Sequence, residues 1–398
     1  MREGWEYQKL GELVKVINGL WVGKKPPFTN VAVVRNANFT KSCTLDMSNV
    51  AYIDVEEKQF NTRELQYADI IIEKSGGSEK QPVGRPVFFN IKDRGYSFSN
   101  FTATLRVVSS DIVPEYLYKV LLAQYKQGVT KRLQSKTTGL HNLDFKSYLK
   151  SVIPIPSCEK QLSIVSELDK INELIRLKKE QLKDYDNLAQ SIFYEMFGDP
   201  VVNEKGWEVK KFSELASFKN GLNFGKNENG YSYKILGVGD FKNNYVVNSS
   251  LLEYINLNDE LSSDYFLKSE DIVFVRSNGS KELVGRCVSV DCTEPTTYSG
   301  FCIRCRLDEN SGVLPMYLLY VCKNKGIREY LTQSGRGCNI SNVNQKILNS
   351  TDIIIPPVSK QELFIQRIEL IEQQKDEIKS TIADLETLLA SRMQYWFD

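Results

Sequence analysis

Residues 4–24 read GWEYQKLGELVKVINGLWVGK, and residues 206–226 read GWEVKKFSELASFKNGLNFGK. Eleven of these 21 positions are identical at a constant offset of 202 residues. Further matches follow in the same order: Asp69-Ile70 returns as Asp271-Ile272, Val83-Gly84-Arg85 as Val284-Gly285-Arg286, and Ile153-Pro154 as Ile355-Pro356. Ordered matches at nearly one period indicate an internal repeat, so the chain is predicted to contain two copies of one module of about 200 residues.

Each copy is predicted to have a mixed α/β part followed by a long helix. Short apolar runs between Gly, Ser and Asn turns predict strands within residues 1–156 and 199–357. Residues 157–197 and 359–397 contain neither Gly nor Pro, which favours uninterrupted helix. We therefore expect globular domains at 1–156 and 199–357, with helical segments at 157–198 and 358–398.

The two helical segments share a narrow apolar seam. Its spacings alternate between four and three residues, which is the 3.5-residue period of a coiled coil. A narrow stripe needs a partner, so the two helices are expected to pair antiparallel, with facing residue numbers summing to about 560. Lys178 would then face Ile382, and Lys375 would face Tyr185 with its amine in solvent. The seam comprises Ile164, Leu168, Ile171, Ile175, Leu182, Tyr185, Ile192, Ile368, Ile371, Ile378, Ile382, Leu385, Leu389 and Trp396.

The expected fold class is α+β, with two pseudo-repeated α/β domains separated by two long helices that form an antiparallel coiled coil. The alternative is that each helix packs on its own globular segment.

Composition limits the class of protein. The 398 residues carry a net charge of +1, with 41% hydrophobic and 25% charged residues, which is globular and excludes wholesale disorder. No apolar run approaches the roughly 18 residues of a membrane helix, and the first residues lack the apolar stretch of a secretory signal. Eight irregularly spaced cysteines indicate reduced thiols, so a cytoplasmic protein is expected.

Charge is distributed unevenly along the chain. Residues 1–150 carry 22 Lys and Arg against 15 Asp and Glu, and residues 201–350 carry 18 against 17. The helical stretches are acidic, with 6 against 9 in residues 151–200 and 5 against 9 in residues 351–398. A basic first copy is compatible with nucleic-acid binding, because local Lys and Arg clusters displace counterions whatever the total charge.

Several chemical motifs are incomplete. Gly19 to Lys24 and Gly221 to Lys226 resemble phosphate-binding loops, but they have three residues between the glycines and no Ser or Thr for Mg²⁺. Lys25-Pro26-Pro27-Phe28 resembles the base-holding element of amino-methyltransferases, with lysine in place of the required polar residue. Neither an NTPase nor a methyltransferase is expected.

Two further arrangements have structural interpretations. Asp69 to Lys74 resembles a nuclease core, but the second copy has Val275-Arg276 where Glu73-Lys74 stands, so a buried strand opening into a basic loop is expected. Cys302 and Cys305, with Cys287 and Cys292 nearby, would make a zinc site only if they shared one face. Residues three apart on a strand point to opposite faces, so buried thiols and no metal are expected.

Polar loops provide the candidate DNA contacts. Arg and Lys read guanine edges, Asn and Gln read adenine edges, and Ser and Thr hold phosphates. His141, the sole histidine, is expected on the surface or on a base. The candidates are Lys24, Lys74, Ser75, Lys80, Arg85, Lys131, Arg132, Lys136, Thr137, His141 and Asn142 in the first copy, and Lys226, Arg276, Ser277, Asn278, Lys281, Arg286, Arg336, Asn339 and Asn342 in the second.

The ordered features resemble the specificity subunit of a type I restriction-modification system. They are Trp-Glu and Asn-Gly opening each copy, an Asp-Ile strand before a Gly-containing loop and Val-Gly-Arg, and Ile-Pro with Gln161 or Gln361 before a long helix. The resemblance implies two target-recognition domains, each reading one half of an asymmetric double-stranded DNA target, with the helices fixing the spacing. No catalytic residue, cofactor or metal is then expected in this chain.

The resemblance also implies partners. Two modification subunits would methylate adenine with S-adenosylmethionine, and restriction subunits would cleave DNA with ATP and Mg. The alternative function is a coiled-coil scaffold whose globular parts bind proteins without DNA specificity. A gel-shift with the modification subunit would separate the two.

Overall fold

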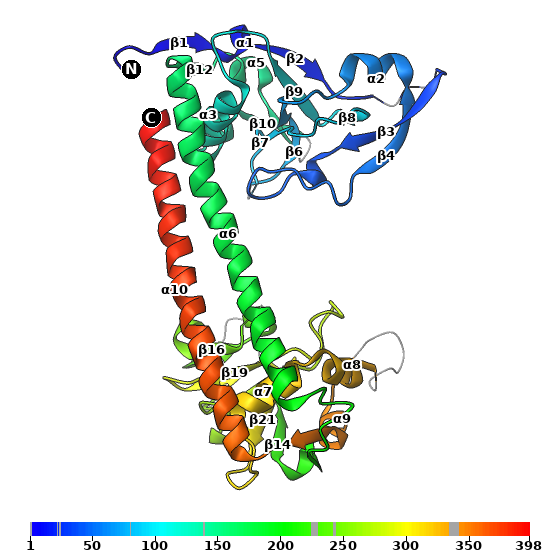
Figure 1. Ribbon diagram of the computed structural model, residues 1–398, viewed down its shortest axis with the longest axis vertical. Helices are drawn as coiled ribbons and strands as arrows, with labels where there is room; N and C mark the ends of the chain where they lie inside the picture. The colour runs from blue at the N-terminus through cyan, green and yellow to red at the C-terminus, as the bar shows by residue number, and fades with distance from the viewer. Residues whose placement is uncertain are drawn as a thin grey trace. The chain divides into compact units, whose positions relative to one another are not determined.

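The computed structural model describes residues 2–21, 23, 25–79, 81–137, 140–223, 230–241, 244–333 and 342–398. The chain divides into two compact units (Figure 1). The first contains Met1–Lys179 with Ser380–Asp398, and the second contains Glu180–Lys379. Each unit therefore holds one globular copy and one half of each long helix, whereas the sequence suggests the helices as separate segments.

The first unit is built from four small sheets. Their strand orders are β1-β12, β2-β9-β5-β7, β4-β3-β8 and β10-β11-β6. The elements are β1 (Glu6–Lys9), α1 (Leu10–Leu13), β2 (Val14–Asn18), β3 (Phe28–Val34), η1 (Asn36–Asn38), β4 (Ala51–Glu56), α2 (Glu57–Arg63), β5 (Ile70–Glu73), β6 (Ser75–Gly77), β7 (Pro86–Phe88), β8 (Tyr96–Phe98), β9 (Thr102–Val107), α3 (Pro114–Lys126), α4 (Val129–Arg132), β10 (Gln134–Thr137), β11 (Leu140–Leu143), α5 (Phe145–Tyr148), β12 (Val152–Ile155) and α6 (Cys158–Phe197).

The second unit repeats this plan with changes. Its sheets run β13-β22, β14-β21-β18-β19-β16 and β17-β15-β20. The elements are β13 (Glu208–Lys211), η2 (Phe212–Glu214), β14 (Ala216–Asn220), β15 (Tyr231–Leu236), η3 (Val238–Asp240), β16 (Val246–Asn248), η4 (Ser249–Leu251), β17 (Glu253–Leu257), η5 (Ser263–Tyr265), β18 (Ile272–Val275), β19 (Cys287–Asp291), β20 (Thr296–Tyr298), β21 (Cys302–Leu307), α7 (Pro315–Lys323), α8 (Lys325–Gln333), α9 (Gln345–Ser350), β22 (Asp352–Ile355) and α10 (Val358–Phe397).

The central strand of each unit is buried throughout because both of its faces are covered, and it is apolar except for Glu73 at the end of β5. All four residues of β5 are buried, and so are all four of β18. The strand is preceded in each copy by a buried aspartate held by an arginine on the neighbouring strand: Asp69 with Arg106 at 2.7 Å, and Asp271 with Arg306 at 2.6 Å. This shared ion pair gives the repeated Asp-Ile motif a structural role.

The junction with each long helix is also repeated. Gln161 is fully buried, donates to the carbonyls of Asp111 and Pro156, and accepts from the Val113 amide. Gln361 makes the same three kinds of bond, and its second acceptor is the Pro356 carbonyl. Each glutamine thus satisfies the backbone where the helix begins.

One match proposed from sequence is wrong. Strand β1 pairs Glu6 with Ile155, and β13 pairs Glu208 with Ile355. The structural counterpart of Ile355-Pro356 is therefore Ile155-Pro156 and not Ile153-Pro154. The offset falls from 202 to 200 residues between the first strand and the last, because intervening loops differ in length.

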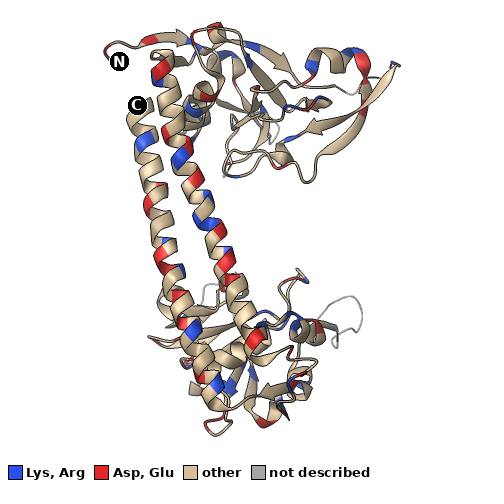
Figure 2. Ribbon diagram, in the orientation of Figure 1, with Lys and Arg blue, Asp and Glu red and all other residues tan. Residues whose placement is uncertain are grey.

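Helices α6 and α10 run antiparallel within each unit. In the first unit, Glu167 pairs with Arg392 and Lys179 pairs with Glu386. In the second unit, Asp186 pairs with Lys375 at 2.8 Å, while Phe193 and Phe197 contact the ring of Phe364. Figure 2 shows acidic and basic residues interspersed along both helices.

The expected seam residues lie on the covered face of these helices. Ile164, Leu168, Ile171 and Ile175 are buried in the first unit's half of α6, whereas Leu182, Tyr185 and Ile192 are half-buried. Along α10, Ile368, Ile371, Ile378, Ile382, Leu389 and Trp396 are buried and Leu385 is half-buried.

Lys375 departs from the expectation for the seam. The sequence suggests that its amine reaches solvent, but the residue is 7% exposed. Its Nζ lies between Asp186 and Glu372, at 2.8 and 2.7 Å. Two carboxylates on either side replace the water that the amine would otherwise need.

Candidate nucleic-acid interface

A three-stranded sheet in the first unit brings together two loops that are distant in sequence. Strand β6 follows β5, and the hairpin of β10 and β11 lies about sixty residues further along. Strand β11 pairs with both, so His141 lies opposite Gly77 and Lys136, and Asn142 lies opposite Ser75. Most of the first copy's candidate DNA contacts therefore share one small sheet and its edges.

Polar bonds fix the start of this sheet. Lys74 donates from Nζ to the Asn18 side chain at 3.0 Å, and the Ser75 hydroxyl donates to the Asn142 amide oxygen. The Lys74 carbonyl also accepts from the Leu143 amide at 2.9 Å. Burial lowers the pKa of Lys74, and an anion beside the amine would offset this cost to its charged form.

Lys131 and Arg132 are exposed on the short helix α4, next to the hairpin. Gly84 packs against Thr130 of this helix. It has φ +89°, and a Cβ added to it would lie 2.6 Å from the Thr130 side chain. Thr130 itself is fully buried. The glycine of Val83-Gly84-Arg85 is therefore required by a turn and a close approach that position two exposed cations.

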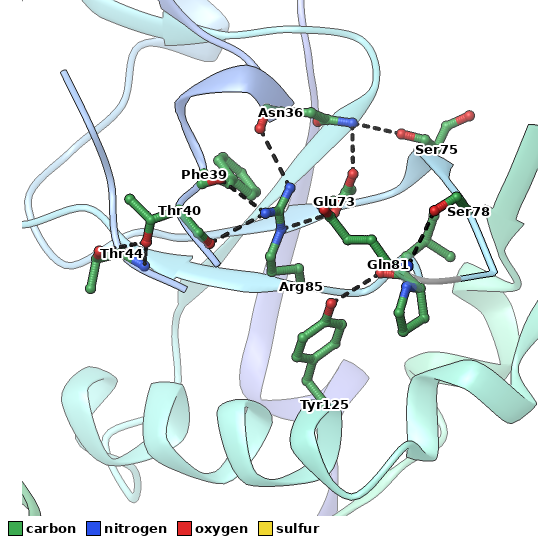
Figure 3. Close-up of polar contacts among 12 residues, drawn as sticks. Asn36, Phe39, Thr40, Thr44, Glu73, Ser75, Ser78, Gln81, Arg85 and Tyr125 are labelled. Atoms are coloured by element: carbon green, nitrogen blue, oxygen red, sulfur yellow. Dashed lines mark hydrogen bonds and ion pairs between the residues drawn. The ribbon is translucent and has the colours of Figure 1, made fainter. Parts of the chain in front are cut away.

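Arg85 was expected to contact DNA, and the structure contradicts this. The residue is 3% exposed, and its Nε lies 3.1 Å from the Glu73 carboxylate (Figure 3). Its guanidinium also donates to the backbone carbonyls of Phe39 and Asn36. A buried cation must be paired and hydrogen-bonded, and Arg85 uses its donors inside the domain.

The second unit repeats the frame of this surface. Arg276 stands where Lys74 stands, and its carbonyl accepts from the Val343 amide at 2.9 Å, as the Lys74 carbonyl does from Leu143. Ser277, Asn278 and Asn342 are half-buried there, and Lys281 is exposed. The two copies thus share this backbone hydrogen bond but carry different side chains around it.

The remaining candidates of the two copies are placed differently or are not described. Arg286 is half-buried and donates to the Glu282 carbonyl at 3.1 Å, so its guanidinium is partly engaged within its own loop. Lys24, Lys80, Lys226, Arg336 and Asn339 lie outside the described residues, and for Lys136 and Thr137 the strand backbone is described.

Two exposed phenylalanines are not among the residues predicted from sequence. Phe101 and Phe301 are 44% and 56% exposed and occupy the same turn in the two copies. The carbonyl of each accepts from the amide of the basic residue that follows the central strand, Lys74 or Arg276, at 2.8 Å. An apolar residue inside Ser-Asn-Phe and Ser-Gly-Phe turns, repeated at an offset of 200, was the available signal.

The motifs that resembled enzyme sites have structural explanations. Asp69 accepts two bonds from Arg106 and one from the Gln66 amide, so it has little capacity left for a metal. Gly19 and Gly221 stand where a Cβ would overlap the carbonyl oxygens of Ser99 and Ser299. Close packing of two backbones therefore accounts for these glycines.

The clustered cysteines face different cores. Cys302 packs with Leu236 and Val273, whereas Cys305 packs with Ile272 and Phe274 on the other side of β21. Burial raises the pKa of Cys302 to about 12 and that of Cys287 to about 11, which favours neutral thiols. Among the described residues, no group of three or more His, Cys, Asp or Glu is arranged to hold a metal ion.

These features define a class: a protein with two divergent copies of one α/β domain, each presenting basic and polar side chains on a common frame. Both copies match one family model, the type I restriction modification DNA specificity domain, over residues 2–184 and 204–386. The chain belongs to this family and contains its domain twice.

Relatives extend over nearly the whole chain. It is 24% identical to the StySPI specificity subunit of Salmonella potsdam, covering 98% of this chain and 87% of that protein. It is 23% identical to the EcoKI specificity subunit of Escherichia coli K12, covering 96% and 84%. These relatives are type I restriction enzyme specificity subunits, which supports DNA recognition over the protein-binding scaffold.

Solved structures share the fold. A chain from a study of assembly and conformational transition of the type I R-M system matches with a TM-score of 0.61 at 16% identity, covering 100% of this chain and 98% of that one. The S subunit from M. genitalium matches with a TM-score of 0.50 at 13% identity, covering 99% and 96%. In the part of the chain that the structure describes, no helix is both long and apolar enough to span a membrane.

Proposed function

We propose that this chain is the DNA-recognition subunit of a type I restriction-modification complex, without catalysis of its own. Each copy would read one half of a split, asymmetric double-stranded target. The observation that carries the proposal is the repeated frame with unlike side chains: Lys74 and Arg276 occupy one position, while the segments after them differ. Similar frames dock on DNA alike, and different side chains select different bases.

The chemistry would belong to partner subunits. We propose that two modification subunits bind S-adenosylmethionine and methylate adenine, and that restriction subunits use ATP and Mg to cleave DNA. The carboxylate of Asp69 and that of Asp271 are each committed to an arginine, which supports a recognition role for this chain. A cytoplasmic location follows from the proposal, since the complex would act on DNA there.

The proposal assigns the reading of each half to named groups. Lys131 and Arg132 are exposed beside the hairpin of the first copy, where side chains can reach a base edge or a phosphate. Arg336 is the corresponding candidate of the second copy. Arg binds the O6 and N7 atoms of guanine in a bidentate manner, and each such pair contributes roughly 1–3 kcal/mol of discrimination.

The test is mapping of methylated sites in cells that express the chain with its modification subunits. Without the gene, methylation at the split target disappears. Arg132→Ala is expected to weaken or relax the half read by the first copy, and Arg336→Ala the other half. Lys92→Ala is the matched control. Lys92 is an exposed cation whose amine lies over the ring of Tyr67, a residue that precedes the central strand β5. Methylation unchanged in the absence of the gene, or equal loss at both halves for either variant, would contradict the proposal.

A further inference from the structure

An exposed phenylalanine occupies the same turn in both copies. Phe101 and Phe301 follow Ser99-Asn100 and Ser299-Gly300, directly before β9 and β21. The turn closes with the amide of Thr102 or Cys302 donating to the serine carbonyl, at 3.0 and 2.8 Å. The residues on either side of the phenylalanine differ between the copies, but the ring is retained.

The backbone that carries each ring is held on two sides. On one side, Gly19 and Gly221 approach the serine carbonyl so closely that a Cβ would overlap it. On the other, the phenylalanine carbonyl accepts from the amide of Lys74 or Arg276 at 2.8 Å. The ring is thus exposed on a rigid support, and no flexible loop is needed to present it.

The surroundings of the ring are those of the candidate interface. In the first copy, the Phe101 ring edge lies 3.9 Å from the position that a Cβ of Gly76 would take, at the edge of the β10-β11-β6 sheet. The Phe101 carbonyl is bonded to the Lys74 amide, and the residue after Lys74 is Ser75, which lies opposite Asn142 in the β6-β11 pair. In both copies the residue bonded to the phenylalanine carbonyl is basic, Lys74 in the first and Arg276 in the second. An apolar ring whose backbone is bonded to that of a basic residue suits a nucleotide of duplex DNA, which combines an apolar sugar with a phosphate.

We propose that Phe101 with Lys74, and Phe301 with Arg276, form a sequence-independent DNA anchor in each copy. The ring packs against a deoxyribose, and the cation holds the neighbouring phosphate. The flanking segments that differ between the copies, residues 131–142 and 331–342, then read the bases. This division of roles rests on the proposed function, and it explains why the ring persists while the reading segments diverge.

The test measures binding of the full chain, with its modification subunits, to the methylated-site duplex and to an unrelated duplex of equal length. Phe101→Ala is expected to weaken binding to both duplexes by a similar factor, about tenfold, because part of the apolar ring is no longer buried. Phe101→Trp keeps a ring and is expected to bind as the unaltered chain does. Tyr67→Ala is the matched control, because Tyr67 is a 49% exposed aromatic residue that precedes β5, whereas Lys74 of the proposed anchor follows it. Mapping of methylated sites is expected to return the same sequence for every variant.

Several results would overturn the inference. Unchanged binding of both Phe101→Ala and Phe301→Ala would show that the rings do not touch DNA. A changed methylated sequence, or weaker binding to the target duplex alone, would make the ring a base reader and not an anchor. A loss in Phe101→Trp equal to that in Phe101→Ala would also contradict a role for the ring. If the unaltered complex binds neither duplex, the proposed function itself fails, which is a separate result.

Discussion

Arg85→Ala is expected to destabilise the first unit and not to remove a DNA contact. Arg85 and Glu73 are 3% and 2% exposed, and the arginine also bridges to the carbonyls of Phe39 and Asn36. Alanine would leave a buried carboxylate without its cation and the buried Phe39 carbonyl without its donor, whereas the Asn36 carbonyl would keep the Phe39 amide. Breaking a buried ion pair from one side costs about 3–5 kcal/mol. For a unit of this size the melting temperature would fall by roughly 10 °C.

The destabilisation should depend on pH in a defined direction. Burial raises the pKa of Glu73, while the Arg85 charge and its hydrogen bond lower it. Removing Arg85 removes the opposing contribution, so the pKa of Glu73 in the folded state rises further. A carboxyl whose folded pKa is raised contributes its full stability below the unfolded pKa and loses it as pH rises through the folded value. The free-energy deficit of the variant is therefore larger at pH about 8 than at pH about 5.

Thermal and urea unfolding at the two pH values measure this deficit. The second copy supplies the design of a rescue variant, because Val275 stands where Glu73 stands. Glu73→Val combined with Arg85→Met replaces the pair by apolar groups and is expected to recover most of the stability. Arg286→Ala, at a half-buried site, is the control and should cost less than about 1 kcal/mol. An Arg85→Ala variant that keeps full stability but loses methylation of one half-site would refute the structural role.

Three other variants have definite expectations. Glu167→Gln weakens the contacts to Arg392 and Trp396 and should lower the free energy of unfolding by roughly 1 kcal/mol. Because the Arg392 hydrogen bond lowers the pKa of Glu167, the native contact stabilises the fold above pH about 4.3 and is lost as the pH falls through the folded-state pKa. The difference between the two proteins should therefore vanish in acid. Gln361→Leu leaves the Leu314 amide and two carbonyls unpaired and should cost about 2–4 kcal/mol by urea unfolding, with Gln366→Leu, exposed on the same helix, as a neutral control. Lys131→Ala with Arg132→Ala should reduce the slope of log binding constant against log salt by about 2 if both cations neutralise phosphates, and an unchanged slope would exclude that role.

The repeat and the helices were predictable because they depend on local pattern. Identity at a fixed offset needs no knowledge of contacts, and the seam follows from the 3.5-residue period alone. Gln161 and Gln361 were found in sequence as markers of the helix start, and the structure adds the three bonds that require a glutamine there.

The departures arose where a partner distant in sequence decides the role. A loop arginine such as Arg85 looks like a DNA contact until Glu73, on the neighbouring strand, is placed beside it. Lys375 looks like a snorkelling lysine until Asp186 from the other helix meets it. The sequence does not mark Phe101 as exposed, because an apolar residue usually belongs to the core and the exposure of this one depends on how its turn is supported.

The most direct test of the central claim is a chain in which residues 206–357 are replaced by residues 4–157, so that both copies are the same while the long helices are retained. Mapping of methylated sites in cells that express this chain with its modification subunits is expected to return a target with the same short sequence in both halves. Methylation of the original asymmetric target would show that the copies do not choose the bases, and would contradict the assignment of one half-site to each copy.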